Sequence, residues 1–451
     1  MQPSSYQNNR PPYQGDQSLY QNNQPPYQGN QPPYYNNKRR NSLFERKPLL
    51  IIVSIVLLTI ALLTGAFAVF NHSRSTYANG IGNSGVRTLP TMQSQQQKGI
   101  MQSNGPITTI NGLARLSVVG STAFILDAHG HTISTDANPY GVAIAAPTTP
   151  LSNVPGSLKA GDIVVTNFGA TETGTTLVRF PGKMGPGHLF NTMANPGTKG
   201  PSAEAFNTST GTDWVANTSG NNVQIFKPDG TLLTTVTSTL FNRPWGQAFN
   251  HGIHNPRDGS VTSFFSTNAA DGTIDRIDVI PTNHSGLPTF KVYQIGQLAH
   301  MGKETFIAVT WIPSLQMHGH LYSDVLLATD PVTNRIAAYP NSTTQNTTTM
   351  RSTNTGITVF QGLPLRTPAG FTINPLNGDL LVVNVQRNDL VELNMSQGKV
   401  VGDRLLDNVP VDPMSGTGSA LFGVAATTDA KGNLAVFFTD DNTNTLDELS
   451  V

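Results

Sequence analysis

The chain has 451 residues with 27 Lys and Arg, 27 Asp and Glu, and no cysteine. Its balanced charge gives no reason to expect a nucleic-acid partner, and the lack of cysteine excludes a disulfide framework and thiol chemistry. The length admits one large all-β domain or several smaller domains, so stability must come from a hydrophobic core.

Residues 1–47 form a segment rich in Gln, Asn, Pro and Tyr, in which Gln7–Gly15 recurs almost unchanged as Gln21–Gly29. This composition cannot bury enough apolar surface to offset the entropy of the chain, so we predict a disordered tail. Pro32–Tyr35 fits the P-P-x-Y pattern of a recognition motif in the polyproline conformation. A solvated tail without such a partner is the alternative.

The stretch Leu49–Phe70 contains no charge, amide or proline. As a helix rising about 1.5 Å per residue, it would span roughly 33 Å, enough to cross a hydrocarbon core of about 30 Å. We therefore predict a transmembrane helix over residues 48–70, with the lipid bilayer as the partner of residues 49–70. Ala66-Phe67-Ala68 also fits a signal-peptide cleavage site, but the apolar run is longer than the usual 7–15 residues or so, which favours an uncleaved anchor.

Positive charge is distributed unequally about this segment. Only Arg74 and Arg87 follow it closely, whereas five basic residues precede it: Lys38, Arg39, Arg40, Arg46 and Lys47. The positive-inside rule then places the N-terminus in the cytoplasm and residues 71–451 outside. The sequence predicts a single-pass protein of the cell membrane, with the polar residues 71–112 as a flexible stalk.

Residues 113–451 consist of short apolar runs separated by Gly, Asn, Asp, Pro and Thr, which predicts an all-β domain. Six repeat units contain a strand that ends in Asn or Asp, within Gly161–Phe168, Thr212–Thr218, Ser260–Ala269, Asp324–Pro331, Gly378–Val385 and Gly432–Asp441. A further strand follows in each unit, within Thr176–Pro181, Asn222–Lys227, Gly272–Asp278, Asn334–Pro340, Asp389–Asn394 and Asn444–Ser450. A Pro-x-Gly turn precedes several units, as at Asn138, Arg243 and Thr367.

Six units spaced about 40–65 residues apart are typical of a six-bladed β-propeller. The order of these motifs, seen best in Gly211–Val236, resembles the NHL-repeat and SMP-30-like six-bladed propellers over roughly residues 115–451. The resemblance implies the fold, because it rests on a repeat texture and not on a catalytic signature. Streptogramin-lyase-like propellers are similar in texture, but their catalytic histidine pattern is not visible here.

The last unit ends at Val451 without a fourth strand. Thr122–Ser134 precedes the first full unit and reads as strand, glycine turn and strand. We therefore predict that this N-terminal piece supplies the outermost strand of the last blade, which closes the ring and covers an edge that could pair with other chains.

One candidate ligand site is the ring of Asn and Asp residues that end these strands: Asn167, Asn217, Asn268, Asp330, Asn384 and Asp440. The loops that lead into the blades place further side chains around the same mouth: Tyr140, Glu204, Arg243, Trp245, Thr305 and Phe422. Carboxylate and amide oxygens suit Ca²⁺ or Mg²⁺, although each Asn or Asp could equally cap its own turn. The SMP-30-like enzymes hold such a metal in their channel, and Glu204 loosely resembles the Glu of their motif.

Histidines form a second candidate site. His251 and His254 lie between the first two strands of the third unit, and His318 and His320 occupy the same place in the fourth unit. Adjacent blades would bring these loops together, and convergent imidazoles bind zinc or copper. An exposed loop without metal is the alternative.

Two classes of function remain open. The first is a non-catalytic binding or scaffold module that recognises a protein or envelope polymer through the Asn/Asp face, chiefly with Tyr140, Glu204, Arg243 and Trp245. The second is a metal-dependent lactonase, hydrolase or lyase of the SMP-30-like type. The first is favoured, since the mouth offers no convergent nucleophile and base.

Overall fold

The computed structural model describes residues 86–87, 105–146, 156–182, 185–191, 195–250, 262–280, 287–299, 306–345 and 353–451. Within these ranges no helix is long and apolar enough to cross a membrane. The tail predicted over residues 1–47 and the helix predicted over residues 48–70 lie outside them.

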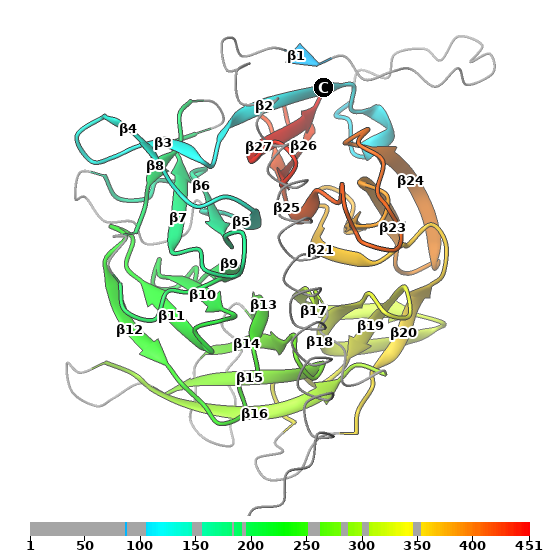
Figure 1. Ribbon diagram of the computed structural model, residues 1–451. Coiled ribbons are helices and arrows are strands. Elements are labelled where there is room, and N and C mark those ends of the chain that lie inside the picture. The colour runs from blue at the N-terminus through cyan, green and yellow to red at the C-terminus, as the bar shows by residue number, and fades with distance from the viewer. Residues whose placement is uncertain are drawn as a thin grey trace, which may run out of the picture. The chain divides into compact units, whose positions relative to one another are not determined.

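The domain is an all-β propeller of six blades, as predicted from the repeats (Figure 1). From the axis outward, the first three blades are built from β5 (Pro139–Ile144), β6 (Ile163–Asn167), β7 (Thr176–Phe180) and β8 (His188–Leu189); β9 (Pro201–Phe206), β10 (Asp213–Asn217), β11 (Asn222–Phe226) and β12 (Leu232–Val236); and β13 (Pro244–Phe249), β14 (Thr262–Asn268), β15 (Thr273–Ile280) and β16 (Thr289–Gln297). The predicted Asn/Asp-ended strands are the second strands of their blades.

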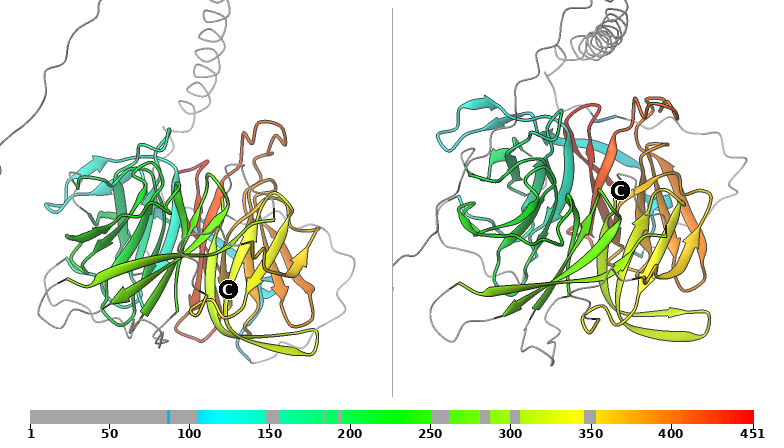
Figure 2. Two further views of the ribbon diagram at one scale, coloured as in Figure 1. Left: turned by 90° about the horizontal axis from the view of Figure 1, so that it is seen from below. Right: turned by 60° about the horizontal axis from the view of Figure 1, so that its bottom comes forward.

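The remaining blades follow the same order. They contain β17 (Val309–Met317), β18 (His320–Asp330), β19 (Arg335–Tyr339) and β20 (Ile357–Gln361); β21 (Pro368–Ile373), β22 (Leu380–Asn384), β23 (Asp389–Asn394) and β24 (Lys399–Leu405); and β25 (Leu421–Thr428), β26 (Leu434–Asp440), β27 (Thr445–Ser450) and β2 (Arg115–Ser121). The sheets stand side by side around the axis in the views of Figure 2.

The core lies between the blades. Among the described residues, six clusters of buried apolar side chains each join two neighbouring blades, including the sixth and the first. Middle strands such as β6 and β22 are therefore buried over their whole length, because each has a neighbouring blade on either side. This explains their continuous runs of Val, Ile and Leu.

Ring closure uses the N-terminal segment as predicted, but a different part of it. β2 pairs with β27 from Arg115↔Ser450 to Ser121↔Thr445. The predicted piece, Thr122–Ser134, instead forms β3 (Phe124–Leu126) and β4 (Thr132–Ser134), which extend the first blade through β8. Three-residue strands are too short to cover the six residues of β27, whereas the seven residues of β2 are sufficient. A further short strand, β1 (Val86–Arg87), pairs with β2.

Residues 107–113 precede β2 and bind the fifth and sixth blades; we call them the strap. The strap contains a turn of 3₁₀ helix, η1 (Ile110–Gly112). The buried carboxylate of Glu392 on β23 accepts the Ile110 amide N–H at 2.9 Å, and Leu434 donates its amide N–H to the Ile107 carbonyl at 2.9 Å. The sequence analysis assigned most of these residues to the stalk, since a polar sequence gives little sign of such anchoring.

The two ends of the propeller differ in what they carry. One end, the mouth face, has the turns between second and third strands and the loops that lead into each first strand. The other end, the opposite face, has the turns between first and second strands, including Asn374 and Asn433. Asn374 donates to the Thr108 carbonyl at 2.8 Å, and Asn433 accepts the Ile107 N–H at 2.9 Å. The strap therefore begins at the opposite face.

Asparagines in several mouth-face turns join one blade to the next. The side-chain oxygen of Asn221 accepts the Arg243 N–H at 2.8 Å, and Asn334 accepts that of Thr367 at 2.7 Å. Across the closure, Asn444 accepts the Asn138 N–H at 2.9 Å. All three partner residues precede the proline that begins a first strand, so the turn of one blade positions the start of the next.

Candidate functional site

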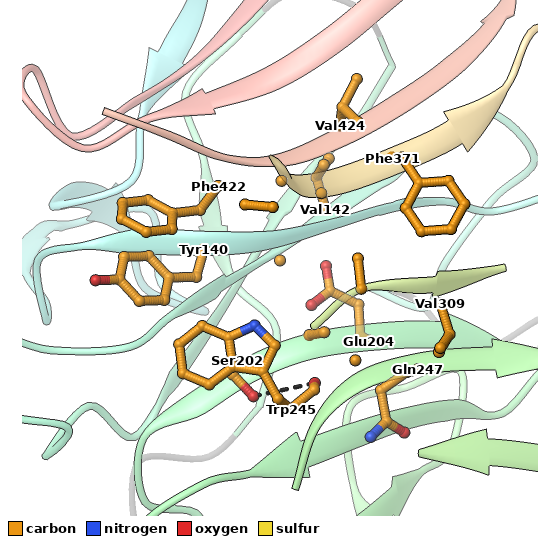
Figure 3. Close-up of a pocket in the computed structure, with 17 residues that line it drawn as sticks. Tyr140, Val142, Ser202, Glu204, Trp245, Gln247, Val309, Phe371, Phe422 and Val424 are labelled. Atoms are coloured by element: carbon orange, nitrogen blue, oxygen red, sulfur yellow. Dashed lines mark hydrogen bonds between the residues drawn. The ribbon is translucent and has the colours of Figure 1, made fainter. Parts of the chain in front are cut away.

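An axial cavity of about 90 Å³ lies where the six first strands meet (Figure 3). Six small residues, one from each blade, form a layer around the cavity: Gly141, Ala203, Gly246, Ala308, Gly370 and Gly423. The residue that follows each of them in the chain also lines the cavity, and these six form a second level: Val142, Glu204, Gln247, Val309, Phe371 and Val424. Each residue of this second level pairs with the residue two before the Asn or Asp that ends its second strand.

Five aromatic rings form a closed cluster over the mouth-face end of the cavity; we call it the aromatic cap. Tyr140 stacks on Phe422 at 4.0 Å and on Phe168 at 4.5 Å between ring centroids. Trp245 lies 5.2 Å from Phe168 and 5.0 Å from Phe306, and Phe306 lies 5.4 Å from Phe422. Phe168, Trp245 and Phe422 are each less than 9% exposed. The cap therefore brings together the predicted residues Tyr140, Trp245 and Phe422.

Polar groups surround the cap. Arg243 forms an ion pair with Glu172, and Glu172 also accepts a hydrogen bond from the Ser219 hydroxyl at 2.8 Å. Burial raises the pKa of Tyr140 above its ordinary range, and the nearby carboxylates of Asp441 and Glu172 raise it further. The predicted contact Arg243 thus lies at the rim of the mouth, with a carboxylate partner that the sequence analysis did not identify.

Glu204 lies below the cap and is 6% exposed. Its carboxyl points among the small residues in Figure 3, and a Cβ on Gly141 would lie 2.3 Å from one carboxyl oxygen. Among the described residues, neither oxygen has a hydrogen-bond partner of normal geometry. Burial raises the pKa of Glu204 well above its ordinary value, the carboxyl of Asp213 raises it further, and the Thr166 hydroxyl and Ala143 amide offset this only in part.

A second buried carboxyl accompanies Glu204. Asp213 is fully buried, and neither of its oxygens has a hydrogen-bond partner within the described ranges. In the register of β9 and β10, Asp213 pairs with Phe206 and Glu204 with Val215, so both acids lie on the side of the second blade that faces the first. Burial raises the pKa of Asp213 well above its ordinary value. The interface between the first two blades therefore contains two buried carboxyls.

The predicted Asn/Asp ring is buried and hydrogen-bonded within the blades. Asn268 donates to Asp275 at 2.8 Å and to the Leu240 carbonyl at 3.2 Å, and Asn384 donates to Asp389 at 2.8 Å. The others make comparable contacts: Asn167 with Thr122 and Thr176, Asn217 with Asn222, Asp330 with Thr333, and Asp440 with Thr443. These bonds hold turns and incoming loops, and the metal predicted for this ring stays a prediction.

The histidine site is described only in part. His318 and His320 flank Gly319 at the exposed tip of the β17–β18 hairpin on the opposite face. His251 and His254, and also Thr305 of the mouth loops, lie outside the described residues. Within those residues, no group of three or more His, Asp or Glu side chains is arranged to hold a metal ion.

The sequence analysis missed Asp213, Gln247, and the Phe168 and Phe306 rings. A usable signal existed for Gln247: four blades have Val or Phe at its level, and only the second and third have Glu204 and Gln247. A polar residue at a position that the repeat keeps apolar is a local departure from the fold's own pattern. The cap rings gave no such signal, because they come from distant parts of the chain.

Stability is expected to depend on pH through Glu204. Its pKa is raised in the folded state, so folding favours the protonated form, and this stabilisation is lost as pH rises above the ordinary value near 4.5. Glu204→Gln keeps the shape but cannot ionise. We expect the free energy of unfolding to fall less from pH 5 to pH 8 in the variant, by up to about 1.4 kcal/mol per pH unit.

Urea unfolding at both pH values measures this difference. Burial also raises the pKa of Asp389, to about 7. Asp389 titrates in both proteins, so its contribution to the pH dependence cancels when the two are compared. Equal slopes for the two proteins would show that Glu204 does not titrate between pH 5 and pH 8.

No protein-family model matches this chain, and no curated protein matches it. Among solved structures it is similar to a streptogramin B lyase, with 17% identity over 70% of this chain and 84% of that chain and a TM-score of 0.39. A virginiamycin B lyase from Staphylococcus aureus is 12% identical over 70% and 96%, with a TM-score of 0.38. A gluconolactonase from Xanthomonas campestris is 11% identical over 74% and 89%, with a TM-score of 0.42. Similarities of this size do not bear on what this chain binds or catalyses.

Proposed function

We propose that this chain is a single-pass membrane protein whose extracytoplasmic propeller binds a protein or an envelope polymer through the rim of its mouth face. The aromatic cap is the observation that carries this proposal. Packed rings cover the cavity at the mouth, so a large partner meets the rim and not the channel. Arg243, Glu172, Ser219 and the Tyr140 hydroxyl supply polar contacts there.

The position of the strap also supports the proposal that a partner binds at the mouth face. The chain joins the propeller at the opposite face, through Ile107 and Thr108. The described chain that leads into the strap therefore contacts the propeller away from the mouth face, which is compatible with a partner bound at that face. Membrane anchoring and kinship with NHL-repeat propellers remain part of the proposal, based on the sequence.

The alternative is a metal-dependent lactonase, hydrolase or lyase. The buried carboxyls of Glu204 and Asp213 favour it, because a channel carboxyl can act as a metal ligand or general base. Turnover of lactone substrates that requires Ca²⁺ or Mg²⁺, and is lost in Glu204→Gln, would favour the enzyme.

Single-cysteine labelling tests the binding proposal cleanly, since the chain has no cysteine of its own. Ser219→Cys and Ser209→Cys form a matched pair, because both are exposed serines of the second blade, on the mouth face and the opposite face respectively. A membrane-impermeant maleimide on intact cells is expected to label Cys at 209 and to react several-fold more slowly at 219. Both should react equally in purified protein.

Ser18→Cys in the tail is the topological control and should stay unlabelled until the cells are opened. Equal labelling of both propeller positions on cells would contradict rim binding. Failure to label either position would contradict the extracytoplasmic location.

A further inference from the structure

We propose that the axial cavity binds a small primary alkylammonium ion, with Glu204 as its counter-ion. This site lies beneath the aromatic cap and does not depend on the rim partner proposed above. The inference begins from two residues that line one cavity and whose buried side-chain oxygens have no hydrogen bond of normal geometry, Glu204 and Gln247.

The two acceptors are a departure from the repeat. Glu204 is 6% and Gln247 7% exposed, at a level where the other four blades have Val or Phe. Among the described residues, the Glu204 oxygens and the side-chain oxygen of Gln247 have no hydrogen-bond partner of normal geometry, whereas the Gln247 amide nitrogen donates to the Ser266 hydroxyl at 3.0 Å. A buried acceptor without a donor costs about 1–3 kcal/mol, so its presence in two adjacent blades points to a ligand that supplies donors.

The charge of the site favours a cation. Asp213 adds a second buried carboxyl beside Glu204, and no Lys, Arg or His is among the residues that line the cavity. A carboxyl in such surroundings stays protonated unless a positive charge joins it. A bound cation would allow Glu204 to ionise and would form charge-assisted hydrogen bonds with it.

The walls favour an organic cation over a metal ion. The Glu204 carboxyl points to the centre of the cavity, whereas the Gln247 amide points away from that carboxyl in Figure 3 and the Ser202 hydroxyl already contacts the Trp245 carbonyl at 3.2 Å. Ca²⁺ takes six to eight oxygens. Tyr140, Trp245, Phe371 and Phe422 instead present aromatic surface, which attracts ammonium ions.

The size of the cavity limits the ligand. A cavity of about 150 Å³ holds benzene and about 10–15 Å³ holds one water, so the cavity of about 90 Å³ suits an ion of only a few heavy atoms. Ethylammonium is a suitable probe, and ethanol is its neutral counterpart of the same size.

Calorimetric titration of the full-length protein in detergent tests the inference. Wild type is expected to bind ethylammonium and not ethanol, and Glu204→Gln should weaken binding about ten- to hundredfold. Asp229→Asn, a half-buried acid in the β11–β12 turn of the same blade and outside the cavity, should bind as wild type does.

Cooperative thermal unfolding of each variant establishes that it is folded. Equal affinity for ethanol, or unchanged ethylammonium binding in Glu204→Gln, would overturn the inference. Binding of Ca²⁺ or Mg²⁺ without binding of ethylammonium would also overturn it and would support the metal-dependent alternative.

Discussion

Gly423→Ala is expected to destabilise the propeller by about 3 kcal/mol, at the upper end for an overpacked core position. Gly423 lies on β25, where the sixth blade approaches the first at the axis. A Cβ there would lie 2.2 Å from the Tyr140 carbonyl oxygen and 3.1 Å from a methyl group of Val142. The carbonyl belongs to the backbone of β5 and cannot rotate away as a side chain could, so the two first strands would have to separate.

The same contact recurs around the axis. A Cβ on Gly246 would lie 2.2 Å from the Ile307 carbonyl oxygen, and one on Gly370 would lie 2.2 Å from that of Phe422. Each glycine of the Pro-x-Gly turn therefore permits the close approach of adjacent blades. Urea unfolding of Gly423→Ala measures the loss. Gly105→Ala is the control, because a Cβ at Gly105 meets nothing within 4 Å; similar midpoints for the two variants would refute this account.

A chain that starts at Thr122 is expected to lose cooperative folding altogether. It lacks the strap and β2, and with them four buried apolar side chains: Ile110, Leu113, Leu116 and Val119. At about 1.5–3 kcal/mol for each, the loss is roughly 6–12 kcal/mol, which is comparable to the whole stability of a typical domain. Strand β27 would also become an open edge, which favours aggregation.

A chain that starts at Gly105 is the matched comparison, since it keeps the strap and β2. We expect it to show one cooperative thermal transition, while the shorter chain shows a broad transition or precipitates. Calorimetry and size-exclusion chromatography measure both properties. An unchanged midpoint in the shorter chain would show that β2 does not close the ring.

The second and third strands of each blade could be predicted from the sequence because their signals are local. Strand β22 is a run of apolar residues that ends at Asn384, and a turn and another apolar run follow it. Burial between two neighbouring blades requires such a run, so the pattern and its cause lie in the same few residues. Closure was harder to predict, because β2 and β27 lie at opposite ends of the domain and neither identifies its partner.

The candidate site was predictable only in part. Tyr140 and Trp245 were identified from their place in the turns, but their packing with Phe168 and Phe306 depends on how the blades meet. Glu204 was selected for a loose likeness to a metal ligand, whereas its notable property is that it replaces an apolar residue beside a second buried acid, Asp213. Such a property becomes visible only when equivalent positions of all six blades are compared in space.

The strap also determines how the propeller would respond to mechanical load. A pull on the chain from its N-terminal side loads the short pairing of β1 with β2 first, then Ile107 and Thr108, and then the buried Glu392–Ile110 hydrogen bond. Beyond them, β2 runs from the opposite face towards the mouth face, paired along its length with β27. Such a force would act along this strand and load its hydrogen bonds together in shear, not one at a time. A domain held by a partner at its mouth face would therefore resist being pulled open at its point of closure.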